Sequence, residues 1–339
     1  MSYLRTWYQN NTFHYKQFGI QELIKIKKKK NTKISLCFPT LNEEQTIGKI
    51  LKVVGRELYG PGLVDEVVAI DSSSSDDTVK IVKSMGFKVY KHKNILPKYG
   101  SYRGKGDALW KSLFILNGDI IAWCDSDIKN FHSGFIYGIL APLLIEEDIF
   151  FVKAFYKRPL KIGGSYIKGE GGRVTNILVR PMLNMFYPEL GKLHQPISGE
   201  YAGRREVFEQ IPFFTGYGVE IGMLIEIYER FGIGKIAQVN VKRRIHRNHS
   251  LSDLSNMSFG ILQAILKKLE YYNKLCLNTE LNNIYNKVEN RGMEYTITPT
   301  KLEEYERPPV LEIEEYMRRK KKTLVLQDRK QGIDAIQAV

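Results

Sequence analysis

The segment Asp125-Ser-Asp127 carries two carboxylates two residues apart, directly after the apolar stretch 119–124. At strand spacing both carboxylates can project to the same side. Open α/β sheets bind their ligands at the carboxyl ends of the strands. Two oxygen donors at such a place suit Mg²⁺ or Mn²⁺ bridging a diphosphate. A solvated turn is the alternative interpretation, because Asp-Ser-Asp is also good turn chemistry.

Three further polar segments are expected at the same edge. Residues 39–43 (Pro-Thr-Leu-Asn-Glu) and 71–73 (Asp-Ser-Ser) each follow a predicted strand, where a nucleoside could lie. Residues 103–107 (Arg-Gly-Lys-Gly-Asp) open a predicted helix, and flexible backbone beside two cations favours anion binding there. A solvated face is the alternative for Arg103 and Lys105.

A second candidate anion site lies in the glycine-rich residues 163–172. Gly169, Gly171 and Gly172 let backbone approach an anion closely, and Thr175 is predicted as a helix N-cap with Arg173 beside it. Phosphate or carboxylate would gain N–H groups and the helix dipole there. An ordinary glycine-rich turn is the alternative.

Two single residues also carry candidate chemistry. His246 stands among three arginines, which should keep its imidazole neutral and available to a metal, although a surface or packed histidine fits equally. Glu220 begins the predicted apolar helix 219–231, whose dipole should keep it ionised. It therefore suits charge stabilisation or hydroxyl binding better than proton donation, with simple helix capping as the alternative.

The elements that must position these residues alternate along the chain. Strands are predicted at 34–38, 64–70, 87–92 and 119–124, with helices between them, the first starting near Asn42. This order predicts an α/β fold with a parallel sheet and right-handed crossovers. No Gly-x-Gly-x-x-Gly follows the first strand, so a dinucleotide site is unsupported. The second half is predicted to contain strands 148–156 and 236–241, helices 175–187 and 219–231, and helices from about 254.

Composition narrows the function classes. The 339 residues hold 51 Lys plus Arg against 37 Asp plus Glu, a net charge of +14 that suits an anionic partner. No RNA-binding signature accompanies the charge, so nucleic acid is not expected. Three scattered cysteines, no secretory core and no long apolar run predict a reduced, cytoplasmic protein without a transmembrane segment.

Eight short motifs then occur in a specific order. They are PTLNEE (39–44), DSSSSDDT (71–78), KGD (105–107), DSD (125–127), GGRVT (171–175), QPISGEYA (195–202), GYGVE (216–220) and RIHRN (244–248). Over roughly residues 33–272 this order resembles the glucosyl-3-phosphoglycerate synthase family, which are retaining GT-A-type glycosyltransferases. The resemblance implies a GT-A-like (Rossmann-like), mostly parallel sheet with flanking helices and a helical C-terminal part.

The resemblance also implies a division of the chain and roles for single residues. A lead-in (1–32) would precede a nucleotide-sugar-binding half (33–150) and an acceptor-binding half (151–272) of the same domain, followed by a helical, polar tail (273–339). Glu220 and Asp127 would be catalytic, and Asp127 and His246 would hold the metal. The acceptor would be bound by Gly172, Arg173, Thr175 and Asn248. The donor would be bound by Pro39, Leu41, Glu43, Ser72, Lys105, Asp125, Ser126, Tyr217 and Arg244.

The implied reaction moves glucose, with retention, from a nucleoside diphosphate glucose (UDP or GDP) to the 2-hydroxyl of 3-phosphoglycerate. The implied cofactor is Mg²⁺ or Mn²⁺, and a homodimer is compatible with the resemblance. A related transferase with another sugar or acceptor, of mannosyl-3-phosphoglycerate or lipid-phosphate type, is the main alternative. A nucleotidyltransferase lacks support because no glycine-rich phosphate loop follows the first strand. A non-catalytic basic binding protein would leave Asp125, Asp127 and residues 171–175 unexplained.

Overall fold

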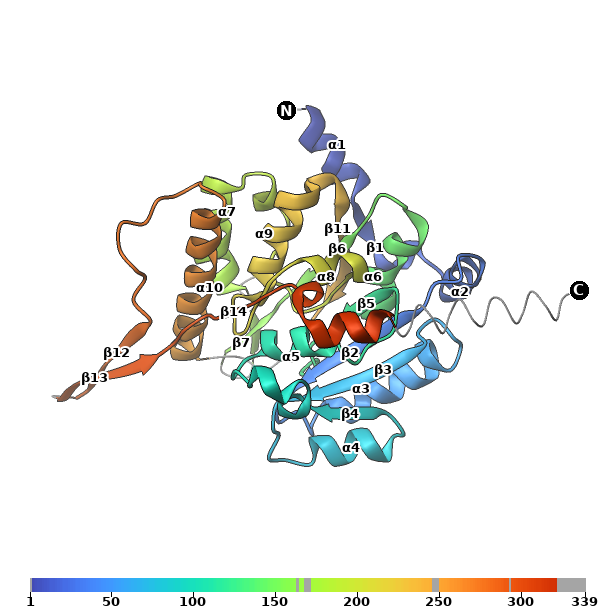
Figure 1. The fold of residues 1–339 in the computed structure, drawn as a ribbon, viewed down its shortest axis with the longest axis horizontal. Helices are drawn as coiled ribbons and strands as arrows, with labels where there is room; N and C mark the ends of the chain where they lie inside the picture. Colours follow the sequence, from blue (N-terminus) through green and yellow to red (C-terminus); the bar gives the residue numbers. More distant parts are fainter. Residues whose placement is uncertain (1, 163–164, 168–171, 246–249, 293, 322–339) are drawn as a thin grey trace, which may run out of the picture.

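The central element of the fold is an eight-stranded sheet with the strand order β1-β11-β6-β9-β5-β2-β3-β4 (Figure 1). The computed structural model describes residues 2–162, 165–167, 172–245, 250–292 and 294–321. Only β9 runs antiparallel to its neighbours, β5 and β6, so the predicted mostly parallel sheet is confirmed. The strands are β1 Thr12–His14, β2 Ile34–Thr40, β3 Glu66–Asp71, β4 Lys88–Lys91, β5 Ile120–Trp123, β6 Phe151–Lys157, β9 Tyr201–Arg204 and β11 Ile236–Arg243.

Helices cover both faces of this sheet (Figure 1). They are α1 Ser2–Asn10, α2 Ile20–Lys29, α3 Ile47–Val54 continued by the wider turn η2 Gly55–Tyr59, α4 Thr78–Ser84, α5 Lys105–Ser112, α6 Gly134–Ile145, η5 Thr175–Val179 continued by α7 Arg180–Phe186, α8 Arg205–Gln210, α9 Val219–Phe231 and α10 Leu251–Tyr271. Shorter 3-10 turns are η1 Tyr15–Gln17, η3 His92–Asn94, η4 Pro97–Tyr99, η6 Leu190–Lys192 and η7 Ile233–Lys235. No helix in the described ranges is long and apolar enough to span a lipid bilayer.

The central strand β5 shows how the sheet separates two apolar layers. Ile121 and Trp123 join the core that contains α5, α8, α9 and α10. Ile120 and Ala122 join the opposite core, which contains α3 and α6. Successive side chains of a strand point to opposite faces, so a run without polar residues is buried on both sides. The polar residues after Cys124 therefore emerge only where the strand has ended.

The first helix after β2 begins later than expected. It starts at Ile47, whereas the acidic residues from Asn42 onward predicted a start near that residue. Asn42 has a positive φ of 57°, and its side-chain oxygen accepts a hydrogen bond from Ser75 N at 2.8 Å. Glu44 likewise accepts one from Asp77 N at 3.1 Å. These side chains therefore tie the loops after β2 and β3 together, and the predicted helix start near Asn42 was wrong.

The N-terminal lead-in is part of the sheet. Strand β1 pairs in parallel with β11 and forms one edge. Trp7 is 4% exposed and its indole N–H donates to the carbonyl of Ile236 at 3.1 Å. A three-residue strand of Thr, Phe and His leaves too weak a pattern to be predicted from sequence.

The C-terminal residues differ from the predicted helical, polar tail. Strands β12 (Ile284–Arg291) and β13 (Glu294–Lys301) form an antiparallel hairpin that projects from the body at the left of Figure 1. Strand β14 (Glu306–Arg307) pairs with β10 (Phe213–Phe214). Among the described residues of this region, helical structure is limited to η8 (Val310–Glu312) and residues 314–321, and Val310, Ile313 and Tyr316 join the core. A further short hairpin comprises β7 (Leu160–Ile162) and β8 (Ser165–Ile167).

Candidate active site

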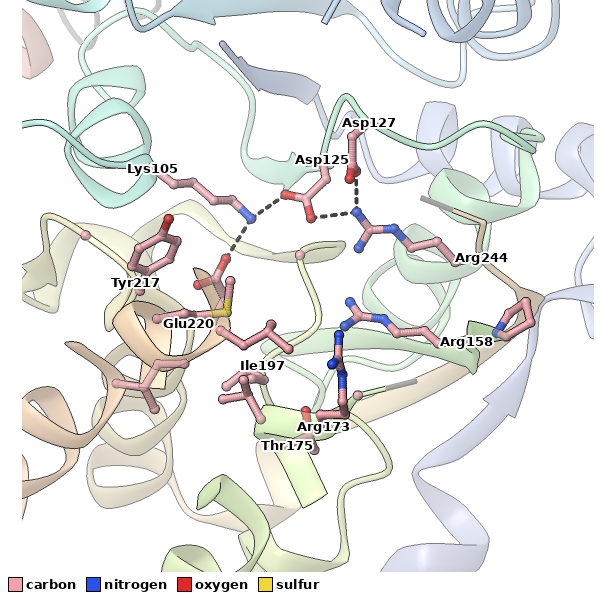
Figure 2. A pocket seen from close by; sticks show the side chains of 18 residues that line it. Lys105, Asp125, Asp127, Arg158, Arg173, Thr175, Ile197, Tyr217, Glu220 and Arg244 are labelled. Carbon is pink, nitrogen blue, oxygen red and sulfur yellow. Dashed lines mark hydrogen bonds and ion pairs between the residues drawn. The ribbon is translucent and has the colours of Figure 1, made fainter. Parts of the chain in front are cut away.

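A cavity of about 280 Å³ lies where the loop after β5 meets the first turns of α5, α9 and η5 (Figure 2). It gathers residues from both halves of the sequence, as expected for ligands bound at the carboxyl ends of parallel strands. The predicted site residues that line it are Lys105, Asp125, Asp127, Gly172, Arg173, Thr175, Tyr217, Glu220 and Arg244.

Lys105 joins three of the elements that surround this cavity. Its ammonium lies 2.5 Å from Oδ1 of Asp125 and 2.6 Å from Oε1 of Glu220. Lys105 is the first residue of α5, Asp125 follows β5 and Glu220 lies in the first turn of α9. Burial alone would lower the pKa of Lys105, but the two carboxylates raise it well above its usual value. The ammonium is therefore permanently charged in this state.

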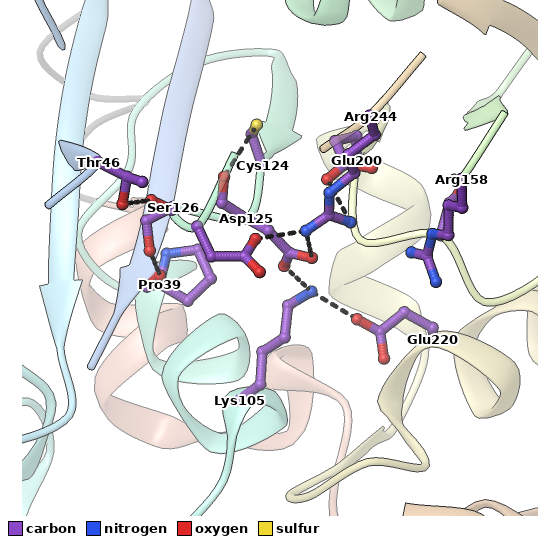
Figure 3. Close-up of polar contacts among 12 residues, drawn as sticks. Pro39, Thr46, Lys105, Cys124, Asp125, Ser126, Arg158, Glu200, Glu220 and Arg244 are labelled. Atoms are coloured by element: carbon purple, nitrogen blue, oxygen red, sulfur yellow. Dashed lines mark hydrogen bonds and ion pairs between the residues drawn. The ribbon is translucent and has the colours of Figure 1, made fainter. Parts of the chain in front are cut away.

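Arg244 provides a second cation beside Asp125 (Figure 3). Its side chain is only 2% exposed. One of its terminal nitrogens donates to Asp125 at 2.9 Å and to Asp127 at 2.5 Å. The other lies 3.0 Å from Glu200 Oε1 and donates to the hydroxyl of Tyr156 at 2.9 Å. Arg244 follows β11, so this cation ties the far part of the sheet to the loop after β5.

The two cations determine the charge of the half-buried Asp125 and influence that of the buried Glu200. Burial alone would raise the pKa of Asp125, but Lys105 and Arg244 hold it well below its ordinary range. For the fully buried Glu200, burial raises the pKa, Arg244 opposes the rise and Asp125 adds to it. Asp125 therefore stays ionised, whereas Glu200 is the carboxyl whose ionisation burial disfavours.

Asp127 fits a divalent cation that is shared with a diphosphate. Its Oδ1 accepts from Arg244, and none of the described residues donates to Oδ2. Within the described ranges, no group of three or more His, Cys, Asp and Glu could hold a metal by itself. Mg²⁺ and Mn²⁺ bound with nucleotides take one or two carboxylates and complete their coordination with phosphate oxygens and water. The other predicted ligand, His246, lies outside the described residues.

The opposite wall of the cavity presents arginines. Arg173 and Arg158 point into it side by side in Figure 2, with Thr175 below them. Gly172 has a φ of +85°, and its carbonyl accepts from Asn176 N at 3.0 Å. The helix therefore already begins after Gly172, and the prediction of Thr175 as its N-cap was wrong. Of the other predicted residues here, Gly169, Gly171 and Asn248 lie outside the described ranges.

Several predicted donor-site residues lie beside the cavity and do not line it. Ser126 donates from its hydroxyl to the carbonyl of Pro39 at 2.8 Å (Figure 3). Ser72 N donates to the carbonyl of Thr40 at 2.9 Å. These contacts join the carboxyl ends of β2, β3 and β5. The residues of this adjacent rim are Pro39, Leu41, Glu43, Ser72 and Ser126, of which Leu41 is exposed. Their binding of a nucleotide stays a prediction.

Sequence reasoning missed three charged residues at the site. Arg158 directly follows β6 and lies with its guanidinium over the ring of Tyr156, so a cation at a strand's carboxyl end was an available signal. Glu200 lies in the motif QPISGEYA (195–202), but no role was predicted for it. Lys153 lies within β6, is 1% exposed, and donates to the carbonyl of Ser198 at 3.0 Å. Burial lowers the pKa of Lys153 to about 7.

The fold and the site together define a nucleotide-sugar glycosyltransferase of the GT-A type. The sequence profile of Glycosyl transferase family 2 matches residues 35–217. The chain is 50% identical to glucosyl-3-phosphoglycerate synthase of Petrotoga mobilis over 90% of its own length and 94% of that protein. It is 43% identical to the synthase of the same name from Mycolicibacterium smegmatis, over 69% of this chain and 77% of that protein. The chain therefore belongs to the glucosyl-3-phosphoglycerate synthase family.

Two solved structures have the same fold as this chain. Glucosyl-3-phosphoglycerate synthase of Mycobacterium tuberculosis, in complex with Mn²⁺, UDP and phosphoglyceric acid, has a TM-score of 0.78 and 37% identity, covering 89% of this chain and 98% of that one. Mannosyl-3-phosphoglycerate synthase of Rubrobacter xylanophilus has a TM-score of 0.85 and 32% identity, covering 91% of this chain and 99% of that one. The predicted GT-A-like fold is thus confirmed.

Proposed function

We propose that the protein transfers glucose, with retention, from UDP-glucose to the 2-hydroxyl of 3-phosphoglycerate. The observation that carries this proposal is the pairing of two unlike walls in one cavity. One wall presents Asp125 and Asp127 bound to cations, and the other presents Arg158 and Arg173. The first suits a metal-bound sugar diphosphate, and the second suits an acceptor with two anionic groups.

The donor half of the reaction is assigned to the first wall. The mycobacterial relative has been solved with UDP and Mn²⁺, and also with UDP and Mg²⁺. In this chain, we infer that Asp125 and Lys105 hold the sugar nucleotide, Arg244 contacts the diphosphate, and Asp127 holds the metal together with His246. A bound divalent ion would neutralise the leaving diphosphate. The rim residues and Tyr217 would complete the nucleotide site: Pro39, Leu41, Glu43, Ser72 and Ser126.

The acceptor is assigned to the arginine wall. The mycobacterial structure contains phosphoglyceric acid, whose phosphate and carboxylate flank the hydroxyl to be glycosylated. We infer that Arg173, Gly172, Thr175 and Asn248 bind it. Arginine suits this task because its planar fork can bind an oxyanion at two points.

Retention is best explained by attack on the same face from which the diphosphate leaves. The acceptor hydroxyl forms the new bond to the sugar C1 as the C1–diphosphate bond breaks, and the departing diphosphate accepts the hydroxyl proton. Glu220 and Asp125 both accept hydrogen bonds from Lys105, which makes either carboxylate a weaker nucleophile for a covalent intermediate. Glu220 is therefore assigned to binding a sugar hydroxyl or stabilising positive charge.

A second candidate is the corresponding mannosyl transfer. The TM-score of 0.85 to a mannosyl-3-phosphoglycerate synthase favours it, whereas the 50% identity to a glucosyl-3-phosphoglycerate synthase favours glucose. The two sugars differ in the orientation of one hydroxyl, so the pocket must discriminate by hydrogen bonding.

The decisive experiment is a matrix of donors and acceptors. UDP-glucose, GDP-glucose and GDP-mannose would each be combined with 3-phosphoglycerate, glycerate and a lipid phosphate, and the product anomer determined by NMR. We expect turnover with UDP-glucose and 3-phosphoglycerate and an α-linked product. Faster turnover with GDP-mannose would replace the proposal by its rival, and a β-linked product would contradict retention.

The cellular setting is also a proposal. Three free thiols, Cys37, Cys124 and Cys276, fit a reducing compartment, so we infer a cytoplasmic enzyme. Activity that copurifies with a periplasmic or secreted fraction would contradict this inference. We also propose, from the resemblance to the family, that residues 33–150 form a donor half and residues 151–272 an acceptor half of one domain.

A further inference from the structure

Glu304 is a buried carboxylate outside the predicted site, in the segment that connects β13 to β14. It is 4% exposed and accepts a hydrogen bond from Gly216 N at 3.0 Å. Its own backbone is fixed on both sides, since its N–H donates to Gln263 Oε1 at 3.1 Å and its carbonyl accepts from Lys267 Nζ at 2.7 Å. A long-range contact thus places this carboxylate at the turn that precedes α9.

The slot that holds Glu304 is formed by glycines. A Cβ at Gly216 would lie 2.4 Å from Glu304 Oε1, and a Cβ at Gly260 would lie 2.6 Å from the same oxygen. Any side chain at either position would push the carboxylate out. Gly216, the first glycine of the motif GYGVE (216–220), therefore contacts a residue 88 positions further along the chain.

The helix that carries Glu220 has no cap of its own. Its N-cap residue is Gly218, and no side-chain hydrogen bond caps it locally. The first N–H groups of a helix need a partner, and a negative charge near them is stabilising. Burial raises the pKa of Glu304, while the N–H groups of Gly216, Gly218 and Tyr217 oppose the rise. The carboxylate of Glu304 thus lies at the N-terminal end of α9 and holds the turn that precedes this helix from a distant part of the chain.

The residues that follow Glu304 are also held in place by contacts with the body of the protein. Thr215 N donates to the carbonyl of Tyr305 at 2.8 Å, and β14 continues the pairing along β10. Arg307 then forms an ion pair of 2.8 Å with Asp107, two residues after Lys105. The segment therefore contacts α5, which carries Lys105, and the turn that precedes α9, which carries Glu220.

We propose that Glu304 is a positioning residue that fixes the turn at residues 216–218, and through it Tyr217 and Glu220, in the catalytic geometry. The inference deepens the proposed function and rests on it for the reaction that is measured. Glu304 itself does not line the cavity; it acts on residues that do.

The test compares Glu304→Gln with the neighbouring control Glu303→Gln, which changes a more exposed carboxylate paired with Lys301. Glutamine keeps the size but places an amide in a slot that is built for a charged acceptor. We expect kcat per folded enzyme to fall about tenfold or more, with the KM for UDP-glucose changed less than about threefold. Amide hydrogen exchange at residues 216–222 should become faster, and Glu303→Gln should match the wild type.

Glu304→Asp provides the second variant, since it keeps the charge but is one methylene too short to reach Gly216. It should also lower kcat. Unchanged kcat in both variants would overturn the proposal, and so would a lower melting temperature with full activity in the folded fraction. A wild type that is inactive with every donor and acceptor would overturn the proposed function itself. In that case, unchanged hydrogen exchange at residues 216–222 in Glu304→Gln would show separately that Glu304 does not fix the turn at residues 216–218.

Discussion

The ammonium of Lys105 lies 2.6 Å from Oε1 of Glu220, and this contact joins the first turn of α5 to the first turn of α9. Both residues lie at helix N-termini, where the dipole favours an anion and disfavours a cation. Glu220 is thus placed favourably by its own helix, while Lys105 depends on the two carboxylates around it. Both residues line the cavity, where charge is expected to change during the reaction.

Replacing Glu220 with Gln should test its role in the transition state. Gln keeps the shape and removes the charge, so we expect kcat to fall by about tenfold or more with little change in the KM for UDP-glucose. Glu280→Gln, which changes an exposed carboxylate of the C-terminal region, serves as the control. Steady-state kinetics with both substrates would measure this effect, and an unchanged kcat would return Glu220 to helix capping.

Asp127 provides the test of the metal assignment. A chelator should abolish turnover, and added Mn²⁺ or Mg²⁺ should restore it. Asp127→Ala should lose about 10²-fold or more in kcat, since an unneutralised diphosphate leaves poorly. The matched control is Asp148→Ala, at a surface carboxylate paired with Lys235. Full activity in excess chelator is the outcome that would exclude the metal role.

Most of the sheet could be predicted from the sequence because its buried strands are short apolar runs that end in polar residues. The strand before Asp125 is the clearest case, and its position correctly placed Asp125 and Asp127 beside a cavity. Helix α9 was predicted with its observed bounds, Val219–Phe231, because its apolar residues are bounded by glycines.

The remaining errors concern contacts between distant segments. Asn42 and Glu44 have the residue types of a helix start, but their side chains pair with the loop after β3. Glu304 resembles any acidic residue of a polar tail until the fold brings it to Gly216. Side-chain partners that are far apart in sequence leave no periodic pattern, so propensity and spacing cannot locate them.

Lys153 should make the stability of the protein depend on pH. Burial lowers its pKa to about 7 in the folded protein, whereas it should titrate near 10.4 in the unfolded chain. Between these values the unfolded chain binds the proton and the folded protein does not. Stability from this group therefore rises with pH, by about 1.4 kcal/mol per pH unit, and the full cost of burying the ammonium is present below pH ~7.

Lys153→Met removes this dependence. The free energy of unfolding of the variant, relative to that of the wild type, should be highest at and below neutral pH. This relative free energy should fall as the pH approaches ~10. Loss of the donor to Ser198 adds a cost that does not vary with pH. Urea unfolding at several pH values would measure the difference, with the exposed Lys25→Met as the control. A difference that is constant with pH would contradict the assignment.

Arg173 provides the test of the proposed acceptor. Arg173→Lys should raise the KM for 3-phosphoglycerate, because lysine cannot bind an oxyanion with a two-point fork. Arg173→Ala should lose more, about 2–4 kcal/mol in kcat/KM. Binding of UDP-glucose should scarcely change, since the proposed function assigns Lys105 and Arg244 to the donor. Arg56→Ala, at an exposed arginine that does not line the cavity, is the control.

The part of the acceptor that Arg173 binds follows from a second acceptor. Glycerate lacks the phosphate, so it should be a poor acceptor for the wild type. If Arg173 binds the phosphate, the loss on Arg173→Ala should be much smaller with glycerate than with 3-phosphoglycerate. Equal losses with both acceptors would move Arg173 to the carboxylate and leave Arg158, beside it in the cavity, as the candidate for the phosphate. No loss with either acceptor would remove Arg173 from the site, and with it the physical reason for naming phosphoglycerate.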